Sequence, residues 1–244
     1  MDKPEQRTDE ADDGNSVEEL VERIQTMPAS GIKSPVDALN PEAGFHRIPN
    51  DPREIRAALR AGEWTWRRFP YYEQRYGERG RRFTRSDSAW IVTLAEYPVT
   101  VAEKHLRWLG TLLAARGMPR WLLETHLGAL YEELVAEVPE KRAAYASLLH
   151  VARAFGDERR RYVDDVTAAS LAVEFDRRVG PEWSARLPET GALLAAAVAD
   201  ERAGIERAVP SILEWIADPV RFPPEWVAAV HRTIDEAQAR SRST

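Results

Sequence analysis

The feature that most constrains this chain is a series of helical patterns with no strand pattern of useful length among them. From residue 51 onward, apolar residues recur every three or four positions, and no stretch alternates apolar and polar residues as a half-buried strand does. Proline stands at the start of several of these runs, as at Pro52, Pro119 and Pro139, where the missing amide hydrogen costs nothing. Because Ala, Leu, Arg and Glu dominate the runs, the sequence predicts an all-α fold.

The boundaries of several helices follow from these patterns. Asp51 followed by Pro52 predicts a helix start with an N-cap, and Ser86 with Asp87 predicts another. Further helices are expected over residues 101–115, 119–138 and 139–155. A shorter helix is expected from Ser16, as its N-cap, to residue 27, and it would dock on the body or on a partner.

The composition of the chain indicates which segment lies outside the helical body and which kinds of site are excluded. Around the short helix, residues 1–44 are rich in Asp, Glu, Pro, Gly, Ser and Asn, so we expect this acidic segment to be mostly disordered.

The chain contains no cysteine, which excludes disulfides, thiolate catalysis and thiolate metal sites. The start resembles no signal peptide and no apolar run is long enough for a membrane span, so we expect a soluble cytoplasmic protein with no membrane partner. The net charge of −6 argues against general nucleic-acid binding.

An internal repeat is the strongest signal for domain organisation. The segment 72–77, Tyr-Glu-Gln-Arg-Tyr-Gly, matches 175–180, Phe-Asp-Arg-Arg-Val-Gly, and Pro-Arg-Trp from 119 to His126 matches Pro-Glu-Trp from 224 to His231. Both matches keep the same order at offsets of about 105 residues. We therefore predict two tandem related halves, residues 45–157 and 158–244, packed as one bundle-like helical body with a pocket at their junction. The alternative is that two helices merely share a common start signal.

The stretch from residue 64 to residue 85 interleaves arginines with aromatic residues. Guanidinium groups bind phosphates and carboxylates, and aromatic faces stack on bases or on arginine, so this composition predicts a site for an anionic ligand. The candidate ligand-binding residues are Arg75, Arg79, Arg81, Arg82, Trp66, Tyr72 and Tyr76. The alternative is an amphipathic helix and turn whose aromatic residues pack on the core and whose arginines pair with nearby acids. Gly77 and Gly80 form no phosphate-loop motif.

Histidine supplies a second candidate site. His126 and His231 fall on apolar helix faces, and His105 and His150 fall on apolar stripes of neighbouring helices. Convergence of His105, His126 and His150 inside the first half would give a site for a transition metal or for haem iron. No Glu-x-x-His or His-x-x-x-His motif accompanies them. The alternative is that a histidine facing the core is a hydrogen-bonded structural residue.

Catalytic motifs are not evident in the sequence. There is no Gly-x-Ser-x-Gly motif, and adjacent acids such as Asp164 and Asp165 do not face one another on a helix. The sequence therefore favours a non-enzymatic binding or regulatory module that recognises a small or anionic ligand, or a protein partner through the N-terminal segment. A haem- or metal-binding helical sensor or oxidative enzyme is the alternative, and catalysis stays open.

Overall fold

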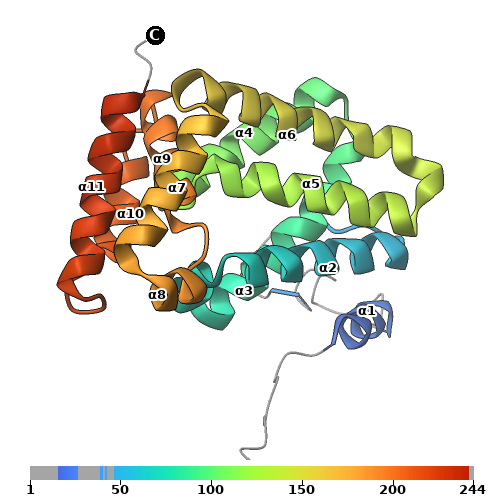
Figure 1. Ribbon diagram of the computed structural model, residues 1–244. Helices are drawn as coiled ribbons and strands as arrows, with labels where there is room; N and C mark the ends of the chain where they lie inside the picture. Colours follow the sequence, from blue (N-terminus) through green and yellow to red (C-terminus); the bar gives the residue numbers. More distant parts are fainter. Residues whose placement is uncertain (1–15, 27–38, 41, 43–46, 242–244) are drawn as a thin grey trace, which may run out of the picture.

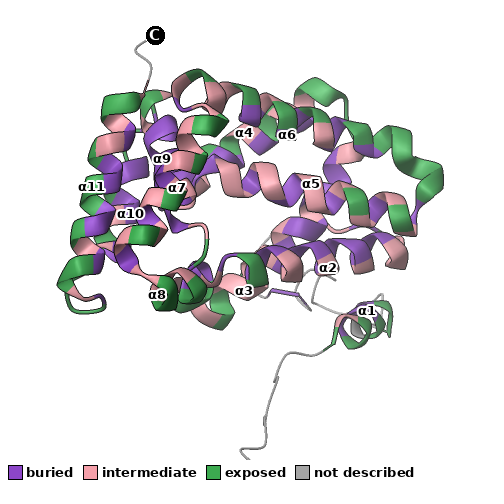
Figure 2. Cartoon of the chain, in the orientation of Figure 1, coloured by how far each residue is buried: buried purple, intermediate pink, exposed green. Residues whose placement is uncertain are grey.

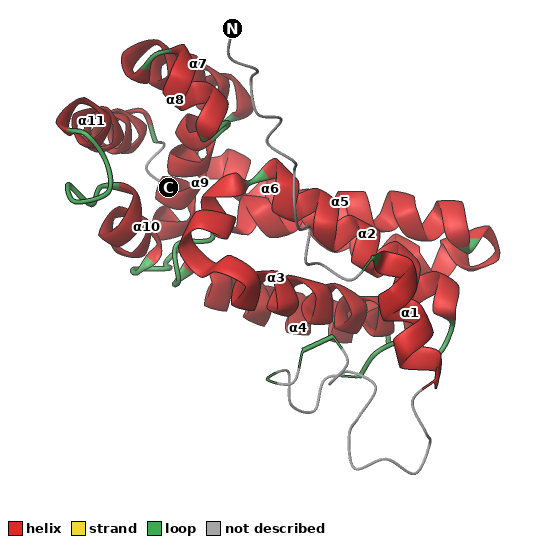
Figure 3. Cartoon of the chain, turned by 90° about the horizontal axis from the view of Figure 1, so that it is seen from below, coloured by secondary structure: helices red, strands yellow, loops and turns green. Residues whose placement is uncertain are grey.

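The chain is helical wherever its structure is described. The computed structural model describes residues 16–26, 39–40, 42 and 47–241, and no strand occurs among them (Figures 1 and 3). This confirms the predicted all-α class. Disorder was predicted for residues 1–44, and most of that segment, residues 1–15 and 27–38, lies outside the described residues.

The helices follow one another with short connections. The first group is α1 Val17–Thr26, α2 Pro52–Arg68, α3 Pro70–Thr93, η2 Leu94–Glu96, α4 Val99–Ala114, α5 Arg120–Glu137, η3 Pro139–Lys141 and α6 Arg142–Tyr162. The second group is α7 Asp165–Val179, α8 Pro181–Arg186, α9 Thr190–Arg202, α10 Ala208–Ile216 and α11 Pro224–Arg240. In Figure 1, α7 to α11 gather on the left, while α2, α5 and α6 extend to the right.

Side chains cap the helix starts that the sequence indicated. The Asp51 carboxylate accepts a hydrogen bond from the backbone amide of Arg53 at the start of α2. At α1, the Ser16 hydroxyl accepts from the Glu19 amide, and the Glu19 carboxylate accepts from the Ser16 amide. This reciprocal pair is a capping box, which satisfies two amides that the helix itself leaves free.

One predicted helix start is wrong. Ser86 and Asp87 lie inside α3, which runs to Thr93. The irregular backbone of this segment is at Gly77, where φ is 53° and ψ is −153°. The Ser86 hydroxyl donates to the backbone oxygen of Phe83, so it acts within the helix instead of capping a new one.

Two main hydrophobic cores underlie the arrangement. The first core joins α1, α2, the end of α3, α4, α5 and α6, and the second joins α7 to α11. Figure 2 marks the buried residues along these helices in purple. Four aromatic residues near the α2–α3 turn pack into the second core instead of the first: Trp66, Phe69, Tyr71 and Tyr72. The turn between α2 and α3 therefore holds the two parts of the molecule together.

A buried ion pair also crosses between the two parts. At the start of α5, Arg120 donates from Nε to Asp200 Oδ1 of α9 at 2.7 Å, and its backbone amide donates to Asp200 Oδ2 at 2.7 Å. Arg120 also binds Glu158 of α6 at 3.0 Å. Burial raises the pKa of Asp200, although Arg120 opposes this. Asp200 receives its hydrogen bonds from Arg120, and Arg120 is shared between Asp200 and Glu158, so the buried pair fixes α5 against α9.

Candidate functional site

The aromatic residues predicted to stack on a ligand are mostly packed inside the protein. Trp66 and Tyr72 are buried, and the Tyr72 ring lies edge-on to Tyr71 at 4.5 Å between centroids. Burial raises the pKa of Tyr72 well above its ordinary value. Tyr76 is half-buried, and its hydroxyl donates to the backbone oxygen of Arg116. These rings stabilise the second core and its contact with the α2–α3 turn.

The arginines of the same segment pair with the protein's own acids. Arg79 and Arg82 bind Glu42, at 2.7 Å and 3.5 Å. Arg81 binds Glu63 at 2.6 Å, and the buried Arg85 binds it at 2.7 Å. Partial burial would raise the pKa of Glu63, but the two arginines outweigh it and lower that pKa. An external anion would therefore have to compete with carboxylates already in place.

Arg75 differs from its neighbours. It forms no ion pair with any described carboxylate; instead, its guanidinium lies 5.0 Å from the centroid of the Tyr76 ring and donates to the Tyr71 hydroxyl at 3.1 Å. Of the four arginines predicted to bind a ligand, Arg75 is the only one that forms no ion pair within the described part of the chain.

The three histidines proposed as metal ligands do not come together. His105 and His150 are exposed, on α4 and α6, whereas His126 is buried in α5. No three side chains of the kinds that bind metals, among the described residues, lie close enough to hold an ion. The expectation that His231 faces the core is wrong as well, since it is exposed on α11. The residues present do not fit a metal or a haem ligated by this trio.

His126 has a different role in the structure. Its Nδ1 lies 2.8 Å from the Thr65 hydroxyl, and its Nε2 lies 3.1 Å from the Ser88 hydroxyl. Burial lowers the pKa of His126 to about 4, so the ring is neutral at neutral pH. Both ring nitrogens are occupied, and the side chain ties α5 to α2 and α3 as a hydrogen-bonded structural residue.

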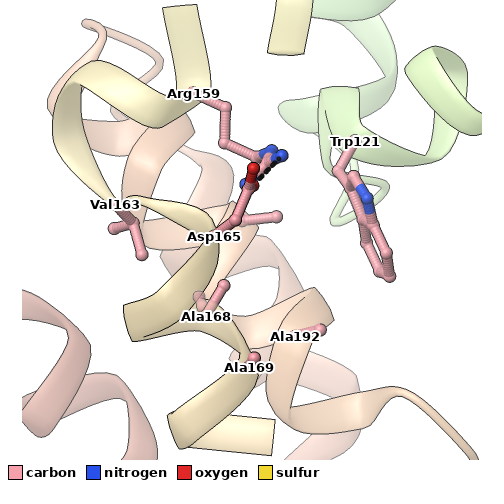
Figure 4. Close-up of a pocket in the computed structure, with 9 residues that line it drawn as sticks. Trp121, Arg159, Val163, Asp165, Ala168, Ala169 and Ala192 are labelled. Atoms are coloured by element: carbon pink, nitrogen blue, oxygen red, sulfur yellow. Dashed lines mark hydrogen bonds and ion pairs between the residues drawn. The ribbon is translucent and has the colours of Figure 1, made fainter. Parts of the chain in front are cut away.

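A pocket of about 200 Å³ opens where α5 and α6 meet α7 and α9. Figure 4 shows Trp121 on one side of it and the small residues of α7 and α9 on the other. The pocket, here called the junction pocket, is lined by Trp121, Arg159, Val163, Asp165, Ala168, Ala169, Ala192, Ala195 and Ala196. Five of these nine residues are alanines, so the space exists because the facing helices carry short side chains there.

The polar part of the junction pocket is an ion-paired group. Arg159 of α6 donates to Asp165 of α7 at 2.8 Å and to Glu124 of α5 at 3.4 Å (Figure 4 draws the first contact). Burial raises the pKa of Glu124, and Arg159 opposes that change. Asp165 is largely exposed, whereas the Arg159 side chain is mostly buried. The polar end of the pocket thus offers N–H donors and a carboxylate acceptor whose charges largely cancel.

A pocket at the junction of the two halves was expected, but none of the residues that line the junction pocket was among the candidate site residues. Its lining combines α5 with α7 and α9, which are far apart in the sequence. The available signal was the run of small residues from Ala195 to Ala197 beside Leu193 and Leu194. Alanine-rich helices are common, however, so this signal does not identify a pocket without the fold.

Comparisons with protein-family models, with curated proteins and with solved structures find no match for this chain. Among the described helices, none is long and apolar enough to span a membrane.

Proposed function

We propose that this protein is a non-enzymatic helical binding module that holds a small, neutral, mostly apolar ligand in the junction pocket. The observation that carries the proposal is the lining itself: Trp121 faces a wall of alanines, and the charges of Arg159 and Asp165 are already matched. An apolar wall with a few polar groups at one end is the usual composition of a ligand site.

The size of the pocket limits the ligand. At about 200 Å³ it is smaller than the ~300 Å³ at which pockets for larger metabolites begin. It is comparable with an apolar cavity of ~150 Å³ that accepts benzene. A single ring, or an alkyl chain of similar size, with one small polar group therefore fits the space, with its ring against Trp121.

The charge balance limits the ligand's polar group. A carboxylate would meet Asp165 and Glu124 as well as Arg159, and an ammonium group would meet Arg159. Either ion would leave a like charge close by, which costs binding energy in a partly buried site. A hydroxyl or an amide can accept from Arg159 and donate to Asp165, so a neutral ligand suits both partners.

The test uses benzyl alcohol as the probe and ¹H–¹⁵N NMR of the Trp121 indole as the signal. We expect a saturable shift with benzyl alcohol, and weaker binding of benzoate and benzylamine. Ala192→Leu, which fills the pocket from α9, should abolish the shift. The control Ala228→Leu adds the same side chain at an exposed position of α11 and should bind as the native protein does. No saturable shift at Trp121, or an undiminished one in Ala192→Leu, rejects the proposal.

The anionic ligand predicted at Arg75, Arg79, Arg81 and Arg82 is a weaker proposal. Three of the four arginines are paired with Glu42 or Glu63, so an anion would gain little there. Binding of a protein partner through the N-terminal segment concerns mainly residues outside the described part of the chain.

We also propose that residues 45–157 and 158–244 arose by duplication of one helical unit. Two local features support this. Gly77 and Gly180, which match in the sequence repeat, both have positive φ with extended ψ, a conformation that is essentially restricted to glycine. Pro119 and Pro224 also match in the sequence repeat and lie at helix starts, Pro119 as the N-cap of α5 and Pro224 as the first residue of α11.

A further inference from the structure

Helix α4 has a partly apolar face that the described part of the chain leaves largely uncovered. One side packs on the body through Ala102, Leu106, Leu109 and Ala114, all of which are buried. The other side, here called the α4 outer face, carries Val101, His105, Trp108 and Leu112. His105 and Trp108 are exposed, and Val101 and Leu112 are half-buried. Figure 3 shows α4 along one side of the helical body.

The exposure of Trp108 is the most unusual feature of this face. It is 57% exposed, and Tyr97 and Val99, just before the outer face, are each 43% exposed. Isolated exposed apolar residues are common in proteins, but several together with a tryptophan mark an interaction surface. Tryptophan is also the residue type most enriched among interface residues that dominate binding energy. None of these residues lines the junction pocket, so the α4 outer face is a separate site.

We propose that the α4 outer face binds the same face of a second copy of this chain, with the two α4 helices antiparallel. The outer residues are spaced by four, three and four positions, which is the spacing of a coiled-coil seam. In an antiparallel pair about a twofold axis, Val101 then lies opposite the partner's Leu112, and His105 lies opposite the partner's Trp108. Every member of the face meets a member of the same face, as a symmetric interface requires.

The flanking charges allow this arrangement. Lys104, exposed beside the seam, lies near the partner's Thr111 and meets no like charge. Beyond the ends of the helices, the exposed Arg116 lies near the partner's Tyr97, where a cation–π contact can form. Glu103 and Arg107 are paired with each other at 2.8 Å on their own helix, so neither adds an unbalanced charge. A second copy of the chain therefore brings no like charges together along the seam and can add a cation–π contact at each end.

The extent of the interface predicts a weak dimer. Helix α4 has 16 residues, which corresponds to a length of about 24 Å. A single pair of such helices, extended by Tyr97 and Val99, is near the small end of specific interfaces. We expect self-association in the micromolar range, with the central His105 and Trp108 layers contributing most of the binding energy.

Sedimentation equilibrium of the full chain tests the proposal. The native protein should shift from monomer to dimer as its concentration rises, and Trp108→Glu should weaken self-association roughly 30-fold or more. The control is Val173→Glu, a substitution at a 69% exposed valine of α7, and it should associate as the native protein does. Circular dichroism verifies that both variants stay folded. A native protein that is monomeric to several hundred micromolar, or a dimer unaffected by Trp108→Glu, overturns the proposal.

Cross-linking tests the orientation, and the absence of native cysteines makes it simple. A mixture of Val101→Cys and Leu112→Cys proteins should form a disulfide-linked dimer, whereas neither variant alone should. Efficient cross-linking of either variant alone would show a parallel or different arrangement and would overturn the antiparallel pairing.

Discussion

Replacing His126 by glutamine should remove a defined part of the pH dependence of stability. The ordinary histidine pKa is 6.5, and burial lowers that of folded His126 to about 4. Between these pH values the unfolded state binds more protons than the folded state, so the free energy of unfolding falls as the pH is lowered through this window. At about 1.4 kcal/mol per pH unit, the full effect is about 3 kcal/mol, nearly all of it below pH 6.5.

The pH dependence of the native protein's unfolding free energy does not isolate the effect of His126, because Asp87 changes that free energy in the opposite direction. Burial raises the pKa of Asp87 to about 7, so the folded state binds its proton first and that carboxyl group adds stability as the pH falls. The useful quantity is the difference between the native protein and His126→Gln. Glutamine retains one acceptor and two donors for Thr65 and Ser88, but it does not titrate.

The assay is urea unfolding followed by tryptophan fluorescence at several pH values from 7.5 to 4.5. The difference in unfolding free energy between the two proteins should be constant above pH 7 and should then shift in favour of His126→Gln by about 2–3 kcal/mol at pH 4.5. His231→Gln, at an exposed position of α11, controls for the loss of one histidine. A difference that does not change with pH would refute the argument, because it would mean that protonated His126 is as stable in the fold as in water.

Two further predictions concern packing at the junction and in the helices. Arg120→Met should cost about 3–5 kcal/mol in urea unfolding because it leaves Asp200 buried and unpaired, and the double variant Arg120→Met/Asp200→Asn should recover most of that loss. Gly191→Ala should destabilise the protein by about 1–3 kcal/mol, since a Cβ there would lie 2.6 Å from the Ala172 Cα. Gly128→Ala, which has open space around it in α5, should instead stabilise the protein by about 0.5–1 kcal/mol. Thermal unfolding should therefore give a lower melting temperature for the first variant and a higher one for the second.

Local chemistry explains what the sequence predicted correctly. Asp51 and Ser16 cap helices because their side chains reach amides within three residues, an interaction that depends little on the rest of the fold. Pro119 marks the start of α5 for a different local reason, since its ring fixes φ and it has no amide hydrogen to leave unpaired. The predicted helix start at Ser86 was wrong because a serine hydroxyl can also bind a carbonyl of the preceding turn, so the same residue type fits the interior of α3.

Site residues were harder to predict because their partners are distant in sequence. Periodicity places His126 and His231 beside similar apolar stripes, and both stripes are largely buried, but only the His126 side chain is itself enclosed, between α2 and α3. Likewise, the acids that pair with Arg79 and Arg81 precede them by 37 and 18 residues, so composition could not distinguish a ligand site from a set of internal ion pairs. Periodicity identifies a helix face, whereas the partner of that face depends on the tertiary fold.

The matched glycines of the repeat allow one more quantitative test. At Gly77 and Gly180, φ is 53° and 82°, with ψ at −153° and 169°, and a Cβ at either position would meet nothing within 4 Å. Substitution by alanine therefore isolates the backbone cost of a conformation that other residues avoid, which is about 1–3 kcal/mol. Both Gly77→Ala and Gly180→Ala should lose similar amounts of stability in urea unfolding. A neutral effect at one site would show that the two turns differ in backbone conformation, and it would remove the strongest local support for the duplication.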